Sequence, residues 1–343
     1  MDVLRIAAEE KRTKTLSRET LTAIKTQLDT QGYVVVADVI SHETCELLGR
    51  SVLEDADAVR AKAGRTAHEK RTGRGHLQLG LRRYGPYVRA DLIANPIIES
   101  VVGDILGKGA WLGFYNGNIN CPGSDYQPLH FDRPFSWRSP QAAAEDGLAW
   151  PPPTTTLSCS VALTEITSDT GPTEIYPGTH KETAVLKFAP GERVSNYPEL
   201  LAKWGPPESM TIPKGGVCFR DPRMWHRGVP NQSDTARPMI AVTYHAAKCH
   251  HWRGTLIRDL PAPKLAALLE NPALKIMDDG ELGDGRLVFE ASAETEIASS
   301  PNPYHIQRHL RFVDESEGVD HFMDAHLPGG ARVIHATKSR SGR

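Results

Sequence analysis

The chain of 343 residues carries 40 lysines and arginines against 42 aspartates and glutamates, which gives a formal charge of −2. Nucleic-acid-binding domains are usually strongly basic, so this balance argues against nucleic acid as a partner. Hydrophobic residues make up 39% and charged residues 24%, which argues against wholesale disorder and predicts a soluble globular protein with a substantial core.

The first hundred residues predict helices around one buried strand. A helix is expected between Ser17, its N-cap, and Gly32, which ends it. The valine-rich segment 33–40 predicts a buried strand. Ser41 then caps a long helix, and 95–107 predicts a further short one.

After residue 111 the pattern changes to short apolar runs separated by turns rich in glycine and proline. Such a pattern is typical of strands in an antiparallel barrel or sandwich. The runs are 111–120, 157–166, 215–221 and 238–246. The segment 133–153 holds five prolines and two tryptophans, which predicts a long irregular loop. A last helix is expected at 262–270.

The expected location of the protein is cytoplasmic. The chain has no run of eighteen apolar residues, so we expect no membrane-spanning helix and no membrane partner. Its first fourteen residues lack the apolar stretch of a secretory signal. The five cysteines are scattered without a CxxC pair, and we expect them to be reduced thiols.

Positive charge gathers in the segment 60–89, where nine lysines and arginines face one acid, Glu69. The segment is interpreted either as a solvated basic face or as a binding surface for an anionic ligand.

The sequence QPLHFD carries the strongest chemical signal. His130 and Asp132 are one residue apart, so on a strand their side chains would point to the same face. They would supply two thirds of a facial triad of two histidines and one carboxylate, which leaves three sites of an octahedral iron open. The best candidate for the third ligand is His226, which follows an apolar strand. A single His-x-Asp pair is expected by chance, so this pair gains weight only from the motifs that accompany it.

Arg237 lies eleven residues after His226, just before a predicted strand. A guanidinium there could hold a carboxylate through two parallel hydrogen bonds. An iron with three open sites needs a co-substrate that supplies electrons for oxygen activation. A 2-oxoacid would chelate the metal while its distant carboxylate meets the arginine.

Together with TGPTEIYPGTHK (170–181) and WHRGVPNQSDTARPMIAVTYH (225–245), these residues resemble the phytanoyl-CoA dioxygenase superfamily of iron(II)/2-oxoglutarate oxygenases. The resemblance covers roughly residues 30–250. Its PGSH-like element reads PGTH here, and we expect His180 within it to brace a loop rather than bind metal. The QxxHxD form at 127–132 is closest to the natural-product biosynthesis branch of the superfamily.

The resemblance implies a mainly β protein of the α+β class, with a double-stranded β-helix (jelly-roll) core and N-terminal helices. It implies a single catalytic domain over 1–330, with its core at about 30–250 and a C-terminal extension at 251–330. Residues 331–343 are expected to be a disordered tail. The extension exceeds what the core needs and could serve a homodimer interface.

The resemblance also implies three groups of site residues. The iron ligands, which are the catalytic residues, are His130, Asp132 and His226. The residues that bind 2-oxoglutarate are Arg237, Gln127 and Thr173. The candidate substrate residues, on a predicted strand and on the loops near the ligands, are Asn116, Asn118, Trp137, Trp150 and Arg223.

The implied activity is oxidation of an unactivated carbon of a small organic molecule, a secondary metabolite, with release of succinate and CO₂. The reaction would be a hydroxylation, desaturation or rearrangement. It would use Fe(II), 2-oxoglutarate and O₂, with ascorbate as the reductant in vitro. Related halogenases replace the carboxylate ligand with a small residue, so the presence of Asp132 favours oxygen chemistry.

Three alternatives remain open at this point. One is an acyl-CoA hydroxylase of the phytanoyl-CoA type, whose basic segment 60–89 would bind phosphates. Another is a non-catalytic jelly-roll binding protein or partner subunit. The third is a zinc hydrolase, because the same three ligands can hold zinc.

Overall fold

The computed structural model describes residues 2–246, except 64–66, 82–84, 88, 109 and 190–191, and three short strands further along the chain. The strands in the first part are β1 (Val3–Arg5), β2 (Tyr33–Ala37), β3 (His76–Gly80), β4 (Trp111–Asn120), β5 (Thr156–Ala162), β6 (Thr173–Ile175), β7 (Glu208–Met210), β8 (Val217–Arg220), β9 (His226–Gly228) and β10 (Arg237–His245). The three later strands are β11 (Leu274–Met277), β12 (Arg286–Phe289) and β13 (Leu310–Arg311).

The α-helices of the described part are α1 (Ala8–Thr13), α2 (Arg18–Gln31), α3 (His42–Ala63), α4 (Ala67–Thr72), α5 (Ala90–Ile93), α6 (Pro96–Leu106), α7 (Pro140–Glu145) and α8 (Pro198–Lys203). The 3₁₀ helices are η1 (Gly85–Tyr87), η2 (Thr179–Lys181), η3 (Thr183–Lys187) and η4 (Val194–Asn196). None of the helices in the described part of the chain has the length and hydropathy of a membrane-spanning segment.

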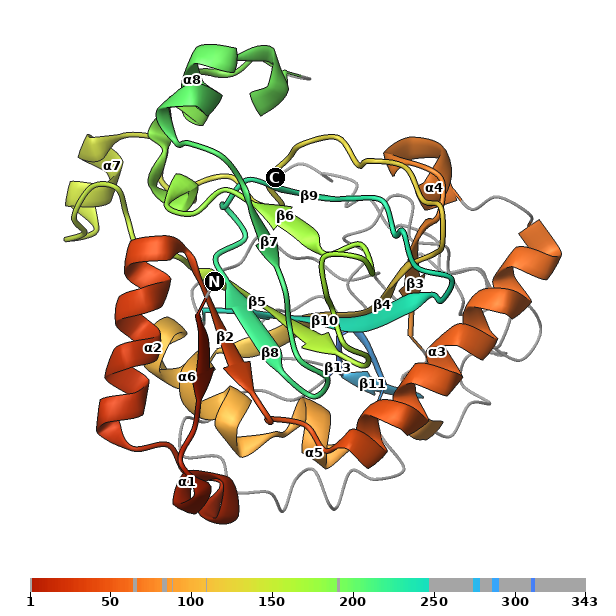
Figure 1. Ribbon diagram of the computed structural model, residues 1–343. Helices are drawn as coiled ribbons and strands as arrows, with labels where there is room; N and C mark the ends of the chain where they lie inside the picture. The colour runs from red at the N-terminus through yellow and green to blue at the C-terminus, as the bar shows by residue number, and fades with distance from the viewer. Residues whose placement is uncertain are drawn as a thin grey trace.

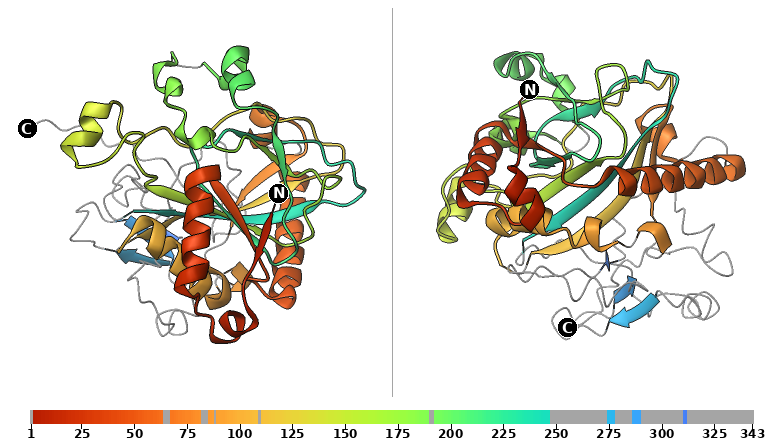
Figure 2. Two further views of the ribbon diagram at one scale, coloured as in Figure 1. Left: turned by 60° about the vertical axis from the view of Figure 1, so that its left-hand side comes forward. Right: turned by 60° about the horizontal axis from the view of Figure 1, so that its bottom comes forward.

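A seven-stranded sheet in the order β1-β2-β8-β5-β10-β4-β3 forms the centre of the molecule (Figure 1). Its pairs are antiparallel except for β1 and β2. Helices α2, α3 and α6 pack on one face, where α2 and α6 lie side by side (Figure 2). The fold is therefore a mixed α/β arrangement built around a large sheet.

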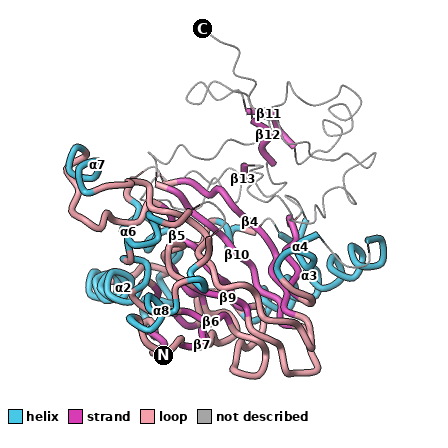
Figure 3. Tube along the Cα trace, turned by 90° about the horizontal axis from the view of Figure 1, so that it is seen from above, coloured by secondary structure: helices cyan, strands magenta, loops and turns pink. Residues whose placement is uncertain are grey.

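The other face of the large sheet is met by a smaller sheet in the order β7-β6-β9 (Figure 3). An apolar cluster joins the two sheets and includes Val35 of β2, Ile175 of β6 and Met210 of β7. A cavity lies beside this cluster, and Met210 and Met239 belong both to the cluster and to the cavity wall.

Side chains alternate between the two faces of the large sheet, as the two-residue period of a strand requires. On β10, Ile240 and Val242 are buried on the helix side. Met239 and Ala241 point the other way and line a cavity between the sheets. Asn118 of β4 lies opposite Met239 in register, so its polar side chain faces the same cavity.

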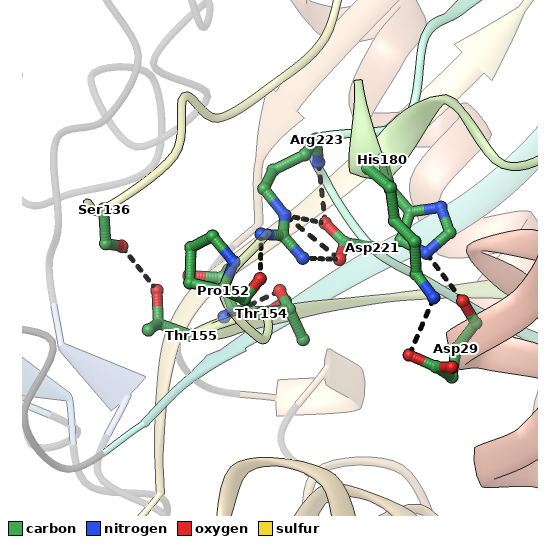
Figure 4. A network of polar contacts seen from close by, with 10 residues as sticks. Asp29, Ser136, Pro152, Thr154, Thr155, His180, Asp221 and Arg223 are labelled. Carbon is green, nitrogen blue, oxygen red and sulfur yellow. Dashed lines mark hydrogen bonds and ion pairs between the residues drawn. The ribbon is translucent and has the colours of Figure 1, made fainter. Parts of the chain in front are cut away.

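The predicted N-terminal elements are confirmed. Ser17 caps α2 by accepting a hydrogen bond from the Thr20 N–H, and Gly32 ends the helix at φ +85°. A Cβ at Gly32 would lie 2.6 Å from Nδ1 of His180. His180 itself donates from Nε2 to the Asp29 carbonyl at 3.0 Å, so it braces the end of α2, as expected (Figure 4).

The predicted loop at 133–153 is wrong in one respect, since it contains the short helix α7. Ser139 accepts a hydrogen bond from the Ala142 N–H at 3.1 Å and Pro140 occupies the first helical turn. These are standard features of a helix start, and three alanines follow. The expected helix at 262–270 and the tail at 331–343 lie outside the described residues.

Candidate metal centre

The backbone brings His130 and His226 together. Each donates its N–H to the carbonyl of the other, at 3.0 and 2.8 Å, which makes an isolated antiparallel bridge. Their ring centroids lie 4.4 Å apart. His226, which follows the apolar strand β8 as expected, is the first residue of strand β9. His130, expected on a strand, contributes only this one bridge.

Asp132 completes a compact group with the two histidines. Its Oδ1 lies 3.7 Å from Nε2 of His130 and 3.4 Å from Nε2 of His226. The ligand atoms of the three residues all lie within 4.8 Å of one another, and no other such group occurs among the residues that the structure describes. Adjacent ligands of an octahedral ion with bonds of about 2.1 Å lie about 3 Å apart, so small movements would close the group on a metal.

Backbone carbonyls orient both imidazole rings. Nδ1 of His130 lies 2.8 Å from the Pro128 carbonyl, and Nδ1 of His226 lies 2.9 Å from the Met224 carbonyl. A ring that donates from Nδ1 keeps a free lone pair on Nε2, the atom that faces Asp132. Burial and the neighbouring His226 lower the pKa of His130 to about 4, so this ring is neutral at physiological pH, as metal ligation requires.

The Asp132 carboxylate is held in its ionised form. Burial by itself would raise its pKa, but His226 and Arg220 outweigh burial and keep the pKa well below its usual value. Arg220 donates from Nη2 to Oδ2 of Asp132 at 2.7 Å. The carboxylate is 38% exposed, and it forms part of a cavity wall.

This cavity has a volume of about 510 Å³ and lies between the two sheets. Its walls include the three clustered residues and a second set of polar side chains from the inner face of the large sheet. That set comprises His76, Gln78, Asn118, Asn120, Ser158, Ser160, Arg220, Arg237 and Thr243.

Arg237 is the first residue of β10 and is buried in the cavity wall. Its Nη2 donates to the Gly171 carbonyl at 2.7 Å, while its Nε has no hydrogen-bond partner in the described part of the chain. Burial lowers its pKa to about 10, which leaves the guanidinium charged at neutral pH. A buried cation with an unsatisfied donor suits an anionic ligand.

An asparagine network fixes the loop that Arg237 contacts. Asn120 donates to the carbonyls of Gly171 at 3.0 Å and Val229 at 2.8 Å. Asn231 donates back to the Asn120 carbonyl at 3.0 Å. The guanidinium of Arg237 therefore contacts a backbone carbonyl, that of Gly171, whose position is fixed by a second hydrogen bond.

Gln127 and Thr173 line the cavity and lie on either side of Gly228. Gln127 donates its backbone N–H to the Gly228 carbonyl and accepts the Gly228 N–H on Oε1, both at 2.9 Å. Thr173 lies opposite Gly228 in the pairing of β6 with β9. A Cβ at Gly228 would lie 2.6 Å from Cε1 of His76, so glycine permits this close approach.

The sequence analysis missed several polar residues of the cavity wall, among them His76 and Arg220. Burial lowers the pKa of His76, whose Nε2 donates to the Asp125 carbonyl at 2.6 Å. The only available signals were the alternation of His76 with Gln78 on β3 and the position of Arg220 at the end of β8.

Only one of the five candidate substrate residues lines the cavity. Asn118 lines the cavity, whereas Asn116 is buried and does not. Trp137, Trp150 and Arg223 are not among the residues that line it.

Arg223 has structural partners instead. It forms an ion pair with Asp221 at 2.6 Å and donates to the Pro152 carbonyl at 2.8 Å (Figure 4). It lines a smaller cavity of about 230 Å³, whose walls also include Ser136 and Thr155. Trp137 donates to Asp146 at 2.6 Å, outside both cavities.

The basic segment is partly neutralised. Arg60 pairs with the buried Glu69 at 3.0 Å, and Arg89 pairs with Asp91 at 2.9 Å. These two cations are engaged within the protein, which favours the interpretation of the described part of the segment as a structural surface.

A family model supports what the motifs indicate. The model of the phytanoyl-CoA dioxygenase (PhyH) family matches residues 28–239, and the chain belongs to this family. The resemblance inferred from the sequence motifs is thereby confirmed.

Two curated relatives are dioxygenases. The chain is 26% identical over 170 residues to dioxygenase andF of Emericella variicolor, which covers 47% of the chain and 50% of the relative. It is also 26% identical over 170 residues to the ectoine dioxygenase of Bordetella bronchiseptica, which covers 45% of the chain and 52% of the relative. The chain thus spans about half the length of the curated relatives it matches.

Two solved structures are similar, both described as non-haem α-ketoglutarate-dependent enzymes from nogalamycin biosynthesis. The carbocyclase SnoK matches with a TM-score of 0.46 and 21% identity, over 68% of this chain and 85% of its own. The epimerase SnoN matches with a TM-score of 0.47 and 19% identity, over 67% of this chain and 82% of its own.

Proposed function

We propose that the protein is a non-haem iron(II)/2-oxoglutarate-dependent dioxygenase that oxidises an unactivated carbon of a small secondary metabolite, with release of succinate and CO₂. The observation that carries this proposal is the meeting of three ligand atoms within 4.8 Å in the wall of a cavity that also contains the buried Arg237. The relatives named dioxygenases agree with it.

The donor set fits ferrous iron. Two neutral imidazole nitrogens and one carboxylate oxygen are the ligands of the facial triad of iron(II) oxygenases, which leaves three positions open. The two facing sheets are interpreted as the halves of a double-stranded β-helix, with the triad at their open side.

The chain's own residues bind and orient the reactants. His130, Asp132 and His226 hold the ion, and Arg237 binds the far carboxylate of 2-oxoglutarate through charge-assisted hydrogen bonds. Gln127 and Thr173, on either side of Gly228, orient the co-substrate. The bound iron and co-substrate together supply the activation of O₂ and the oxidising power, while the protein excludes water and positions the substrate.

The test is a turnover assay with purified protein, Fe(II), 2-oxoglutarate, ascorbate and O₂, screened against a library of natural products. We expect one succinate per oxidised product, and no product without O₂. Oxygen-independent hydrolysis would indicate a zinc hydrolase instead. Binding of iron and 2-oxoglutarate without succinate, with every compound, would indicate a non-catalytic partner subunit.

A further inference from the structure

Arg220 stands between two of the three clustered residues. It ends β8 on the inner face of the large sheet, and its side chain is 8% exposed. Its Nη2 lies 2.7 Å from Oδ2 of Asp132, and its Nη1 lies 3.1 Å from Nδ1 of His226. Its Nε has no hydrogen-bond partner among the described residues.

The bond to Asp132 is the stronger of these two contacts. Nδ1 of His226 donates to the Met224 carbonyl at 2.9 Å when Nε2 is free for a metal. A nitrogen that carries a proton cannot also accept one from Arg220, so Nη1 packs beside the ring without a hydrogen bond. The guanidinium therefore acts on the site chiefly through Oδ2 of Asp132, by a charge-assisted bond.

We infer that Arg220 is a positioning residue of the metal centre, which holds Oδ2 of Asp132 and so restricts this carboxylate to metal ligation through Oδ1. This inference rests on the proposed function. With Oδ2 occupied by Arg220, Oδ1 is the oxygen that faces both Nε2 atoms, at 3.7 and 3.4 Å.

The number of open metal positions depends on this restriction. An octahedral ion held by three protein atoms has three positions left, two for a chelating 2-oxoacid and one for O₂. A carboxylate that bound through both oxygens would take one of these positions. Arg220 thus preserves the last one.

A purely structural role of Arg220 predicts a different result. The cation would then only tie the loop of Asp132 to β8, and its loss would lower the stability of the fold while leaving the coordination number unchanged. Removal of a positive charge beside a dication would also relieve Coulomb repulsion and strengthen metal binding, so Mn(II) affinity by itself does not report on positioning.

The experiment uses Mn(II) as the probe, with the full chain of the wild type and of Arg220→Met. Water ligands are counted from the broadening of the Mn(II) EPR lines in oxygen-17-labelled water. We expect three waters in the wild type and one after addition of 2-oxoglutarate. In Arg220→Met we expect two waters without 2-oxoglutarate and none with it, because Asp132 then binds the metal through both oxygens.

Arg223→Met is the matched control, since Arg223 is equally buried and pairs with Asp221 rather than with a ligand. It should keep three waters. Three or more waters in Arg220→Met would overturn the inference, whatever its Mn(II) affinity. If circular dichroism shows that Arg220→Met does not fold, the water ligands are counted in Arg220→Leu instead. Unfolding of both variants would also reject the inference. The succinate assay tests the proposed function separately, because it does not depend on the water count.

Discussion

The two oxygens of Asp132 face different partners, and this asymmetry organises the site at the scale of single residues. Oδ1 faces the two imidazoles, while Oδ2 accepts from Arg220. The Asp132 carboxylate is already ionised and the His130 ring is already neutral, so neither group has to release a proton when a dication binds.

Replacement of the carboxylate tests this arrangement. We expect Asp132→Ala to weaken Mn(II) binding about 100-fold or more, which corresponds to roughly 2.7 kcal/mol, because the only anionic ligand of the group is lost. Isothermal titration calorimetry measures the change. The control is Asp104→Ala, which removes a partly exposed carboxylate on α6 that lies 3.9 Å from Lys25. This variant should bind Mn(II) as tightly as the wild type does. Equal affinity in both variants would remove Asp132 from the ligand set.

The guanidinium of Arg237 is tested by Arg237→Met. The Mn(II)-loaded variant should bind 2-oxoglutarate about 30- to 150-fold more weakly, since a charge-assisted pair of about 2–3 kcal/mol is lost. Its Mn(II) affinity should change little, because Arg237 forms no hydrogen bond or ion pair with His130, Asp132 or His226. Arg227→Met, at a cation paired with Glu174 at 2.8 Å, serves as the control. An unchanged dissociation constant for 2-oxoglutarate in Arg237→Met would contradict the clamp.

At the scale of elements, the loop before β6 carries the acceptor that seats Arg237. Gly171 has φ +70°, and a Cβ there would lie 2.2 Å from Nδ2 of Asn120. We expect Gly171→Ala to destabilise the protein by about 1–3 kcal/mol and to weaken 2-oxoglutarate binding, because the carbonyl that holds Arg237 must move.

Gly147→Ala is a control that introduces backbone strain without displacing a neighbouring atom. Gly147 has a similar φ of +71°, but no atom lies within 4 Å of the position that a Cβ would take there. Its substitution should cost stability through strain alone and leave 2-oxoglutarate binding unchanged. Equal 2-oxoglutarate affinities in the two variants would show that the Gly171 carbonyl does not position the clamp.

Glu10 couples the starts of two helices and predicts a dependence of stability on pH. Its carboxylate accepts from the N–H groups of Ala7 at 2.9 Å and Ser17 at 2.7 Å. Burial by itself would raise its pKa, but these backbone hydrogen bonds prevail and lower it to about 2. Because the folded pKa lies below the ordinary value of 4.5, this stabilisation is full above pH 4.5 and is lost as the pH falls toward 2.

Urea unfolding of Glu10→Gln measures this contribution. The variant should be about 1–3 kcal/mol less stable than the wild type at pH 7, and the difference should shrink below pH 4. Glu9→Gln, at an exposed carboxylate that pairs with Arg12, should show little change at either pH. A difference that stays constant down to pH 2 would contradict the assigned cause.

At the scale of the whole molecule, ligands that bind between the two sheets should stabilise the fold. Mn(II) at 100 times its dissociation constant should add about 2.7 kcal/mol to the free energy of unfolding, with a further gain from 2-oxoglutarate. A thermal melt should therefore move upward by several degrees. The Asp132→Ala variant should show no such shift at the same Mn(II) concentration, and a shift equal to that of the wild type would place the metal elsewhere.

The sequence alone determined the local elements and the chemistry of the most specific motif. The Ser17 cap, the Gly32 stop and the valine-rich strand β2 depend on nearby residues, so they can be predicted from the sequence. His130 and Asp132 do come together, but on a bridge residue and a bend rather than on the strand that the sequence predicts. The order of the motifs added the expectation of His226 and Arg237, because that order is specific to a family.

Only the tertiary structure decided which distant side chains join the site. Arg220 lies 88 residues from Asp132 in sequence, and His76 comes from the edge strand β3. Strand register turns both toward the cavity, whereas Trp137 and Arg223, close to the ligands in sequence, face partners outside it. The physical reason is that the position of a side chain relative to a sheet face depends on long-range pairing, which short sequence patterns do not encode.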